Sequence, residues 1–207
     1  MERLRSDYSN WEPLSVMEIV HIFNDIPAQW YIAGGWALDL YLGQQSREHS
    51  DIDITILREE QTIVYEKLSS EWTLYKAHHG KLSLWEKGEH LDIVGDVWVS
   101  RDCKSPFAFQ LMLVDTEQEQ WIYKRQPAIR RPLDDILLTT ASGVPYLKPE
   151  IQLLYKGGGS QVRPKDEQDL MTVLPILNEQ AKEWLRYALN EQFPEGHPWV
   201  TQINNSG

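Results

Sequence analysis

The 207-residue sequence contains a single cysteine, Cys103, so it can form no internal disulfide and no cysteine cluster for zinc. Histidines number only six, and they show no ligand pattern typical of a zinc hydrolase. Apolar runs of membrane-spanning length are absent, and Met1–Pro13 lacks the apolar core of a signal peptide. These absences predict a protein of the reducing cytoplasm with no membrane partner.

Basic residues are few compared with acidic ones. The chain has 20 Lys and Arg against 31 Asp and Glu, a formal net charge of −11. Binding of duplex DNA or long RNA needs a basic face, so we expect no duplex nucleic-acid partner. An acidic cleft concentrates cations, which suits a cationic small molecule. Many soluble cytosolic proteins are equally acidic, however, so charge alone does not choose a substrate.

The composition is otherwise that of an ordinary globular protein, with 42% hydrophobic and 25% charged residues. The length allows one substantial domain or two small ones. The first part of the chain mixes period-two and helical patterns. Strands are expected at 30–33, 51–57, 72–76, 82–86, 90–94 and 107–114, with helices at 15–25, 36–43 and 59–69. Segments 82–86 and 90–94 suggest a hairpin around Lys87-Gly88.

The later part of the chain has helical spacing instead. Helices are expected at 148–156, 164–177 and 179–193, with Pro175 kinking or ending the second of them. Gly157–Ser160 is expected to be a connector between helices, and it lacks the lysine and hydroxyl spacing of a P-loop. The sequence therefore predicts an α+β fold: a small mixed β-sheet domain with flanking helices at residues 1–131, then a C-terminal helical region at 132–207.

Two aspartates carry the chemical signal of the first part. Asp51 and Asp53 are two residues apart on an expected strand, so both side chains point to the same face. Adjacent carboxylates repel each other unless a cation lies between them. Magnesium binds through one or two carboxylates together with substrate phosphates. The pair is thus a candidate magnesium site, although a D-x-D pair alone is more often a solvated strand end.

A glycine pair precedes these acids. Gly34 and Gly35 lie between an expected strand and an expected helix, where a backbone without side chains can approach a phosphate. Arg47 could add a charge-assisted phosphate contact, whereas His49 is better explained as a surface or half-buried residue. Alone, a double glycine is usually just a turn. The order strand, Gly-Gly, helix and then D-x-D is far more specific.

The segment GGWALDLYLGQQSREHSDIDI resembles the signature of the nucleotidyltransferase superfamily that includes polymerase β. More narrowly, it is similar to the aminoglycoside (2″) nucleotidyltransferases and related antibiotic-resistance adenylyltransferases. The resemblance is strong over residues 32–56, and the later stretch RPKDEQDL also resembles the helical region of such proteins. Lys165, Asp166 and Asp169 in that stretch are expected to form an ion-pair network that braces the helices.

The resemblance implies a third carboxylate on a neighbouring strand, which acts as a metal ligand, as the general base for the attacking hydroxyl, or as both. Asp92, between Leu91 and Ile93, is the preferred residue. Asp96 would lie on the same face if the strand continued past Gly95. Lys148 is a further expected nucleotide contact. Lys156 is an equally good candidate for a phosphate contact or a solvated helix lysine.

The expected reaction is transfer of a nucleoside monophosphate from ATP, or another NTP, to a hydroxyl of a small, cationic, aminoglycoside-like acceptor, with Mg²⁺ as the cofactor. Asp51, Asp53 and Asp92 would be the metal and catalytic residues, and Gly34, Gly35, Arg47 and Lys148 would bind the nucleotide. Two alternatives remain open: a nucleotidyltransferase that acts on RNA or protein, as toxin-like relatives do, and a non-catalytic nucleotide-binding protein. The acceptor and the oligomeric state are not specified by the sequence.

Overall fold

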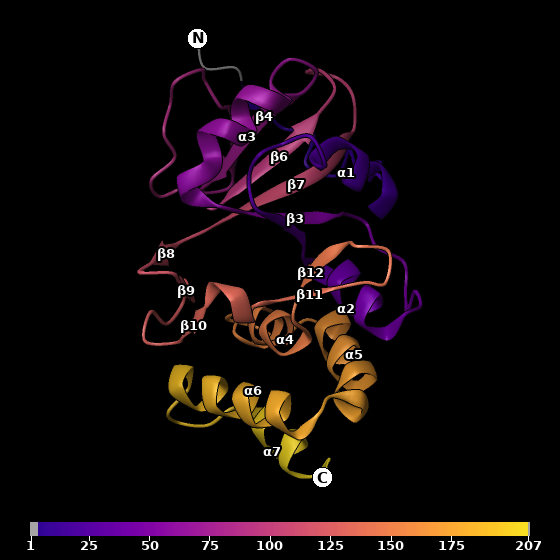
Figure 1. The fold of residues 1–207 in the computed structure, drawn as a ribbon, viewed down its shortest axis with the longest axis vertical. Helices are drawn as coiled ribbons and strands as arrows, with labels where there is room; N and C mark the ends of the chain where they lie inside the picture. Colours follow the sequence, from indigo (N-terminus) through magenta and orange to yellow (C-terminus); the bar gives the residue numbers. More distant parts are fainter. Residues whose placement is uncertain (1–3, 207) are drawn as a thin grey trace. The chain divides into compact units, whose positions relative to one another are not determined.

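The computed structural model describes residues 4–206 and has the predicted α+β fold (Figure 1). The chain forms two compact units. The first comprises Met1–Trp36 and Glu48–Thr116, and the second comprises Ala37–Arg47 and Glu117–Gly207. The division therefore falls inside helix α2 (Gly34–Leu42), and residues 117–131 belong to the second unit.

The first unit is built on a mixed sheet. Its strands are β1 (Leu4–Arg5), β2 (Trp30–Ile32), β3 (Asp53–Leu57), β4 (Thr73–His78), β5 (Lys81–Leu84), β6 (Asp96–Ser100) and β7 (Phe107–Val114). Within this unit they follow the order β1-β5-β4-β6-β7-β3-β2. The pair β3 and β7 is parallel, and the other neighbours are antiparallel.

Two helices contribute buried side chains to the core of the first unit. Helix α1 (Val16–Phe23) begins at Ser15, whose hydroxyl and backbone form a capping box with Glu18. The Phe23 ring lies 5.9 Å from the ring of Phe109 on β7. A short helix η1 (Arg58–Glu60) leads into α3 (Gln61–Leu68), whose buried residues include Val64 and Leu68.

The prediction of a strand at residues 90–94 is wrong, and so is the hairpin around Lys87-Gly88. The alternation of Leu91 and Ile93 is misleading, because Leu91 is buried whereas Ile93 is 72% exposed. The strand begins later, at Asp96, as β6 between β4 and β7. Strand β5 pairs with β4 across the turn at His79-Gly80 instead.

Two side chains explain why residues 90–94 are not a strand. The Arg58 guanidinium donates from Nη1 to the carbonyls of Leu91 at 2.8 Å and Val94 at 2.6 Å. The fully buried Gln61 accepts from the Leu91 backbone N–H at 2.7 Å. Backbone groups that a strand would pair with a neighbour are thus satisfied by two side chains, and the segment is an irregular loop.

The second unit begins with a small sheet and a hairpin. Strands β8 (Thr116–Glu117), β9 (Gln120–Ile122) and β10 (Arg130–Pro132) form a three-stranded sheet in the order β10-β9-β8. A short helix η2 (Leu133–Asp135) then leads to the antiparallel hairpin of β11 (Leu137–Thr139) and β12 (Pro145–Leu147). This hairpin lies in the region for which only helices were predicted.

The three predicted C-terminal helices are present. They are α4 (Pro149–Gly157), α5 (Pro164–Val173) and α6 (Glu179–Gln192), and a further helix α7 (Pro198–Asn204) follows. Pro175 ends α5 as expected, because the chain tightens into η3 (Leu174–Ile176) there. Gly157 is the last residue of α4 and not a connector. A Cβ on it would stand 2.6 Å from the Trp199 ring, so glycine permits the close packing of α4 on α7.

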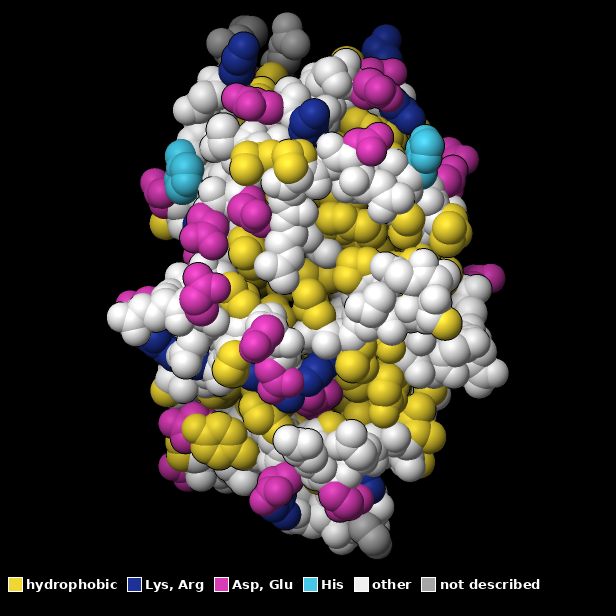
Figure 2. Space-filling model, in the orientation of Figure 1, with side chains coloured by type: hydrophobic (Ala, Val, Ile, Leu, Met, Phe, Trp, Pro, Cys, Tyr) yellow, Lys and Arg dark blue, Asp and Glu magenta, His cyan; other side chains and the backbone are white. Residues whose placement is uncertain are grey.

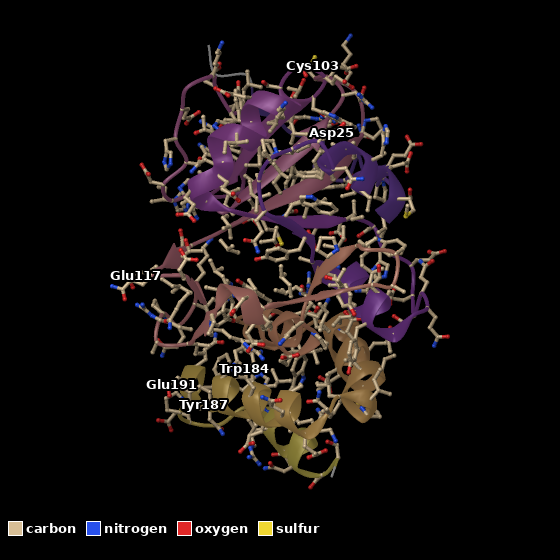
Figure 3. All side chains as sticks on the ribbon, in the orientation of Figure 1. Asp25, Cys103, Glu117, Trp184, Tyr187 and Glu191 are labelled. Carbon is tan, nitrogen blue, oxygen red and sulfur yellow. The ribbon has the colours of Figure 1, made fainter. Side chains whose placement is uncertain are left out.

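The surface agrees with the acidic composition. Figure 2 shows acidic side chains scattered over the visible face, with basic ones between them and no basic stripe among the residues it colours. Cys103 is exposed in the loop between β6 and β7 (Figure 3). Between residues 4 and 206, every helix is too short or too polar to cross a lipid bilayer.

Candidate active site

The start of helix α2 and the start of strand β3 meet at two residues, Gly34 and Asp53. The backbone N–H of Ala33 donates to the carbonyl of Asp53 at 2.8 Å, which continues the ladder between β2 and β3. Gly34 has a φ of +66°, and a Cβ built on it would stand 2.1 Å from Asp53 Oδ2. The Asp53 carboxylate therefore occupies the space over the first turn of a helix, where backbone N–H groups favour anions.

Asp51 lies two residues before Asp53 and precedes β3, not within it as predicted. The pairing with β7 nevertheless extends back past Asp53, because the Gln110 N–H donates to the carbonyl of Ile52 at 2.9 Å. Ile52 is fully buried, whereas Asp51 and Asp53 are both partly exposed. This alternation is the one expected for two carboxylates on the same side of an extended segment.

Two further polar residues share the face of Asp53. Gln110 on β7 is the direct partner of Asp53 in the parallel ladder, so their side chains project from the same face. The Gln110 amide donates from Nε2 to Asp96 Oδ1, at the start of β6, at 2.9 Å. Asp53, Gln110 and Asp96 thus form a row across three neighbouring strands, and all three are partly exposed.

Asp92 does not take the place predicted for it. It lies in a bend before β6, its side chain is 82% exposed, and its carboxylate pairs with His90 Nδ1 at 2.9 Å. Among residues 4–206, no group of three or more His, Cys, Asp or Glu side chains is placed to hold a metal ion. The joint role of Asp51, Asp53 and Asp92 in metal binding stays a prediction, but the structure does not gather the three carboxylates into such a group. The cause is the loop conformation that Arg58 and Gln61 impose on this segment.

The remaining donor set still fits magnesium. Asp51 and Asp53 supply carboxylate oxygens on one side of the chain, and Gln110, the register partner of Asp53, carries an amide on the same face. Magnesium is bound in proteins by one or two carboxylates, with phosphates and water completing its octahedron. The lack of a Cβ at Gly34 leaves room at the helix start for the Asp53 carboxylate. The arrangement thus fits a divalent cation together with a phosphorylated ligand.

Gln110 is the residue that sequence reasoning missed. Its signal was present, because it is the one strongly polar side chain in the apolar strand FAFQLMLV. A polar residue in such a strand is informative, as burial without a partner is costly. What the sequence does not give is the register that sets Gln110 against Asp53.

Arg47 lies in the second unit, in a network of buried charges. Its Nε and Nη2 atoms donate to the two oxygens of Asp169 at 2.8 and 3.0 Å, a bidentate ion pair. Lys156 Nζ lies 2.6 Å from Asp169 Oδ2 and 3.5 Å from Asp166 Oδ1. Asp166 also pairs with Arg163, whose Nε lies 2.6 Å from Asp166 Oδ2. The predicted network exists, but its cations are Arg47, Lys156 and Arg163.

Arg47 and Lys156 both make ion pairs within the second unit. Lys156 is buried and Arg47 is engaged with Asp169, so both brace helices. Burial opposes the ionisation of Asp169, but the hydrogen bond from Arg47 and the charge of Lys156 outweigh it and lower its pKa below the usual value. That Arg47 binds a phosphate stays a prediction.

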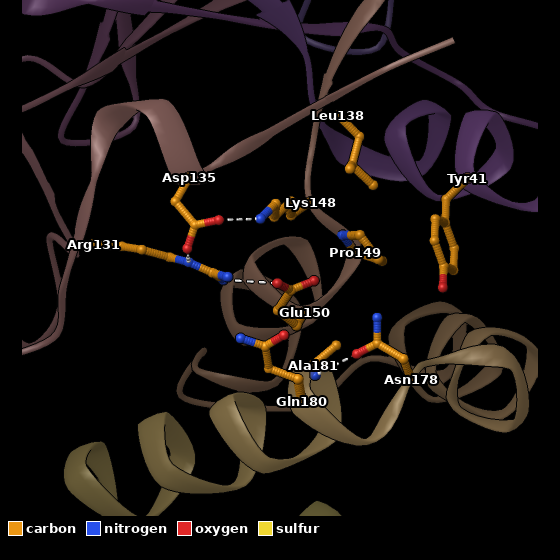
Figure 4. Close-up of a pocket in the computed structure, with 10 residues that line it drawn as sticks. All are labelled: Tyr41, Arg131, Asp135, Leu138, Lys148, Pro149, Glu150, Asn178, Gln180 and Ala181. Atoms are coloured by element: carbon orange, nitrogen blue, oxygen red, sulfur yellow. Dashed lines mark hydrogen bonds and ion pairs between the residues drawn. The ribbon is translucent and has the colours of Figure 1, made fainter. Parts of the chain in front are cut away.

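Lys148 lines a pocket of about 140 Å³ within the second unit (Figure 4). Its ammonium group pairs with Asp135, and the hydrogen bond from Lys148 lowers the pKa of that carboxyl. Arg131 lies between two carboxylates: its Nε is 2.7 Å from Asp135 Oδ2, and its Nη1 is 2.7 Å from Oε1 of the buried Glu150. Figure 4 shows Tyr41 and Asn178 on the other side of the pocket. Two cations and two carboxylates leave this pocket without a net charge.

Comparisons with known proteins agree with the family resemblance expected from the sequence. Residues 15–93 match the family model of aminoglycoside-2″-adenylyltransferase. A search of curated proteins finds no match. Among solved structures, the solution structure of antibiotic-resistance factor ANT(2″)-Ia aligns over 93% of this chain and 96% of that chain, at 16% identity and a TM-score of 0.57.

Two crystal structures are similar to the same degree. The lincosamide antibiotic adenylyltransferase LnuA with lincomycin bound aligns over 84% of this chain and all of that one, at 16% identity and a TM-score of 0.56. ANT(2″)-Ia in complex with adenylyl-2″-tobramycin aligns over 84% and 94%, at 14% identity and a TM-score of 0.54. These likenesses show the fold. Together with the family match over residues 15–93, they confirm the resemblance of the chain to the antibiotic nucleotidyltransferases and support its assignment as an adenylyltransferase-like enzyme.

Proposed function

We propose that the protein transfers a nucleoside monophosphate, AMP from ATP, to a hydroxyl of a small antibiotic-like acceptor, with Mg²⁺ as cofactor. The observation that carries the proposal is the placement of the Asp53 carboxylate over Gly34 at the start of α2. It sets a metal-binding oxygen beside a helix N-terminus that favours phosphate. The family match over residues 15–93 supports the same reaction class, since it includes both residues.

The chain's own residues contribute positioning and charge. Asp51 and Asp53 hold the ion, which when bound neutralises phosphate charge. The backbone at Gly34-Gly35 approaches the triphosphate, because no side chain intervenes at Gly34. The acceptor hydroxyl oxygen attacks the α-phosphorus. The bond from this phosphorus to the α,β-bridging oxygen breaks, pyrophosphate leaves with the electron pair, and the hydroxyl proton passes to a nearby carboxylate or to water.

The acceptor class is part of this proposal. The neighbouring solved structures carry adenylyl-2″-tobramycin and lincomycin, both of which are small molecules. The net charge of −11 suits a cationic acceptor better than a nucleic acid. We therefore place aminoglycosides first and lincosamides second.

A direct test measures pyrophosphate release from ATP and Mg²⁺ with tobramycin, lincomycin and tRNA in separate reactions. Mass spectrometry then identifies the product that has gained a nucleoside monophosphate. We expect transfer to a small antibiotic and none by the Asp53→Asn variant. Transfer to tRNA or to a protein side chain would replace the acceptor class but keep the reaction. Absence of ATP binding with every divalent cation would favour a non-catalytic protein.

A further inference from the structure

Gln110 stands between two carboxylates on neighbouring strands of the first unit. It is the register partner of Asp53 across β3 and β7. On its other side, its Nε2 donates to Asp96 Oδ1 on β6 at 2.9 Å. The position nearest to Asp53 on the adjacent strand is therefore an amide, while the carboxylate lies one strand further away.

The hydrogen bond to Asp96 determines which end of the amide remains for a ligand. An ionised carboxylate only accepts hydrogen bonds, so the NH₂ end of Gln110 must face Asp96. The carbonyl oxygen, Oε1, is then the end of the amide turned away from Asp96. Carbonyl oxygens of Asn and Gln side chains are suitable ligands for hard divalent cations.

We propose that Gln110 Oε1 is an uncharged oxygen ligand for the divalent cation beside Asp53, and that Asp96 is the positioning residue that fixes the amide in this orientation. The inference rests on the proposed function, because it assigns residues to the cation of that reaction. The site of this chain then carries two carboxylates and one amide. This composition agrees with the absence of a group of three acidic, histidine or cysteine ligands among residues 4–206.

The charge of the site has measurable consequences. Replacement of Gln110 by glutamate adds a third negative charge next to Asp53 and Asp96. Without a cation, like charges on adjacent strands repel each other and destabilise the sheet. With a cation, the same added charge attracts it. Gln110→Glu should therefore lower the melting temperature of the metal-free protein and increase its upward shift with metal.

The experiment is a calorimetric titration of the 207-residue chain with Mn²⁺ alone. One added charge close to the ion should tighten Mn²⁺ binding by Gln110→Glu about tenfold. Gln110→Leu, which removes the ligand oxygen, should weaken binding instead. Gln168→Glu is the matched control, since it makes the same charge change at an exposed position on α5. It should leave the Mn²⁺ affinity unchanged.

Variants of Asp96 separate positioning from general stability. Asp96→Ala removes the acceptor that holds the Gln110 amide and should weaken Mn²⁺ binding about tenfold, as loss of outer partners of metal ligands does. Asp96→Asn retains an amide oxygen that can accept from Gln110 Nε2, so it should restore most of the affinity. A merely structural role would not produce this rescue in a well-folded pair of variants.

The outcomes distinguish this inference from the proposed function. If the wild type binds Mn²⁺ and transfers AMP but Gln110→Leu and Gln110→Glu both keep the wild-type affinity, the role of Gln110 is refuted and the function stands. If the wild type binds no Mn²⁺ with or without ATP, both fail. Opposite shifts of affinity in the two Gln110 variants, with an unchanged Gln168→Glu control, support the inference.

Discussion

The carboxylate of Asp53 and the backbone of Gly34 occupy adjoining space so closely that a Cβ on Gly34 would stand 2.1 Å from Asp53 Oδ2. A real Cβ does not approach a non-bonded oxygen this closely. Gly34, the first residue of α2, and Asp53, the first residue of β3, must therefore fit against each other in space. They lie 19 positions apart in the sequence. The glycine is required by its neighbour as well as by its own φ of +66°.

Replacement of Gly34 by alanine should displace Asp53 and abolish transfer. The positive φ alone costs roughly 1–2 kcal/mol for a residue with a Cβ. Gly43→Ala is the matched control, since Gly43 has a φ of +71° but open space around its Cβ position. Gly43→Ala should lose only that stability and keep its activity. Equal loss of activity in both variants would show that the contact with Asp53 is unimportant. Melting curves and pyrophosphate release measure the two effects.

Asp53→Asn and Asp51→Asn should each abolish AMP transfer while the fold remains intact. Both changes keep the side-chain volume, and both positions are partly exposed, so little packing is lost. Removal of one of two adjacent carboxylates relieves repulsion in the metal-free protein, whereas Asp53→Asn also loses the favourable placement of its charge over the start of α2, so the melting temperature should change little. Circular dichroism and pyrophosphate release check this. Unfolding of either variant would mean that these acids are structural.

Local patterns predicted the elements that local forces determine. The helical spacing of residues 15–25 and 179–193 and the alternation over residues 51–57 depend on residues close in sequence, and each predicted the correct kind of element. Segment 90–94 has the same kind of alternation but forms a loop. Its conformation is set by Arg58 and Gln61, which lie about 30 residues earlier in the chain.

The same distinction applies to the candidate site. Asp51, Asp53 and Gly34 were found from spacing, because they lie close together in one short segment. Gln110 and Asp96 join this site only through the register of β3, β7 and β6, which is a long-range property. A sequence pattern shows that each is a polar residue near apolar ones. It does not show which strand lies beside which.

Asp92→Asn should leave turnover and Mn²⁺ affinity close to those of the wild type. Its side chain is 82% exposed and pairs with His90 in a loop. Removal of a true general base lowers the rate by about 10²–10⁴-fold, so the two cases are easily separated by steady-state kinetics. A loss in that range, with normal Mn²⁺ binding, would restore Asp92 as the base.

Gln61→Ala should destabilise the first unit through the same loop. Gln61 is fully buried and accepts from the Leu91 N–H at 2.7 Å, so its removal leaves a buried donor without its partner. Such a group costs about 1–3 kcal/mol. Urea denaturation measures this loss, and Gln168→Glu, at an exposed position, should show no comparable change. A stable Gln61→Ala protein would mean that the loop does not depend on this contact.

The buried network around Asp169 should make the stability of the second unit depend on acid pH. Arg47 and Lys156 together lower the pKa of Asp169 against the opposing effect of burial. Its pKa in the folded state is thus below that of the unfolded chain, about 3.9. The folded state binds fewer protons than the unfolded state in this range. The stabilisation is complete above pH 3.9 and is lost as the pH falls through the folded-state pKa.

Asp169→Asn should therefore be destabilised at pH 7 by about 3–5 kcal/mol, because it leaves Arg47 and the buried Lys156 without their shared carboxylate. The difference in unfolding free energy from the wild type should shrink as the pH is lowered below 3.9, where the wild-type carboxylate also becomes protonated. Urea denaturation at pH 7, 4 and 3 measures it. Asp25→Asn, which removes an exposed carboxylate of the first unit (Figure 3), is the control and should show no large difference at pH 7. A constant difference between wild type and Asp169→Asn across this range would show that the ionisation of Asp169 does not stabilise the helices.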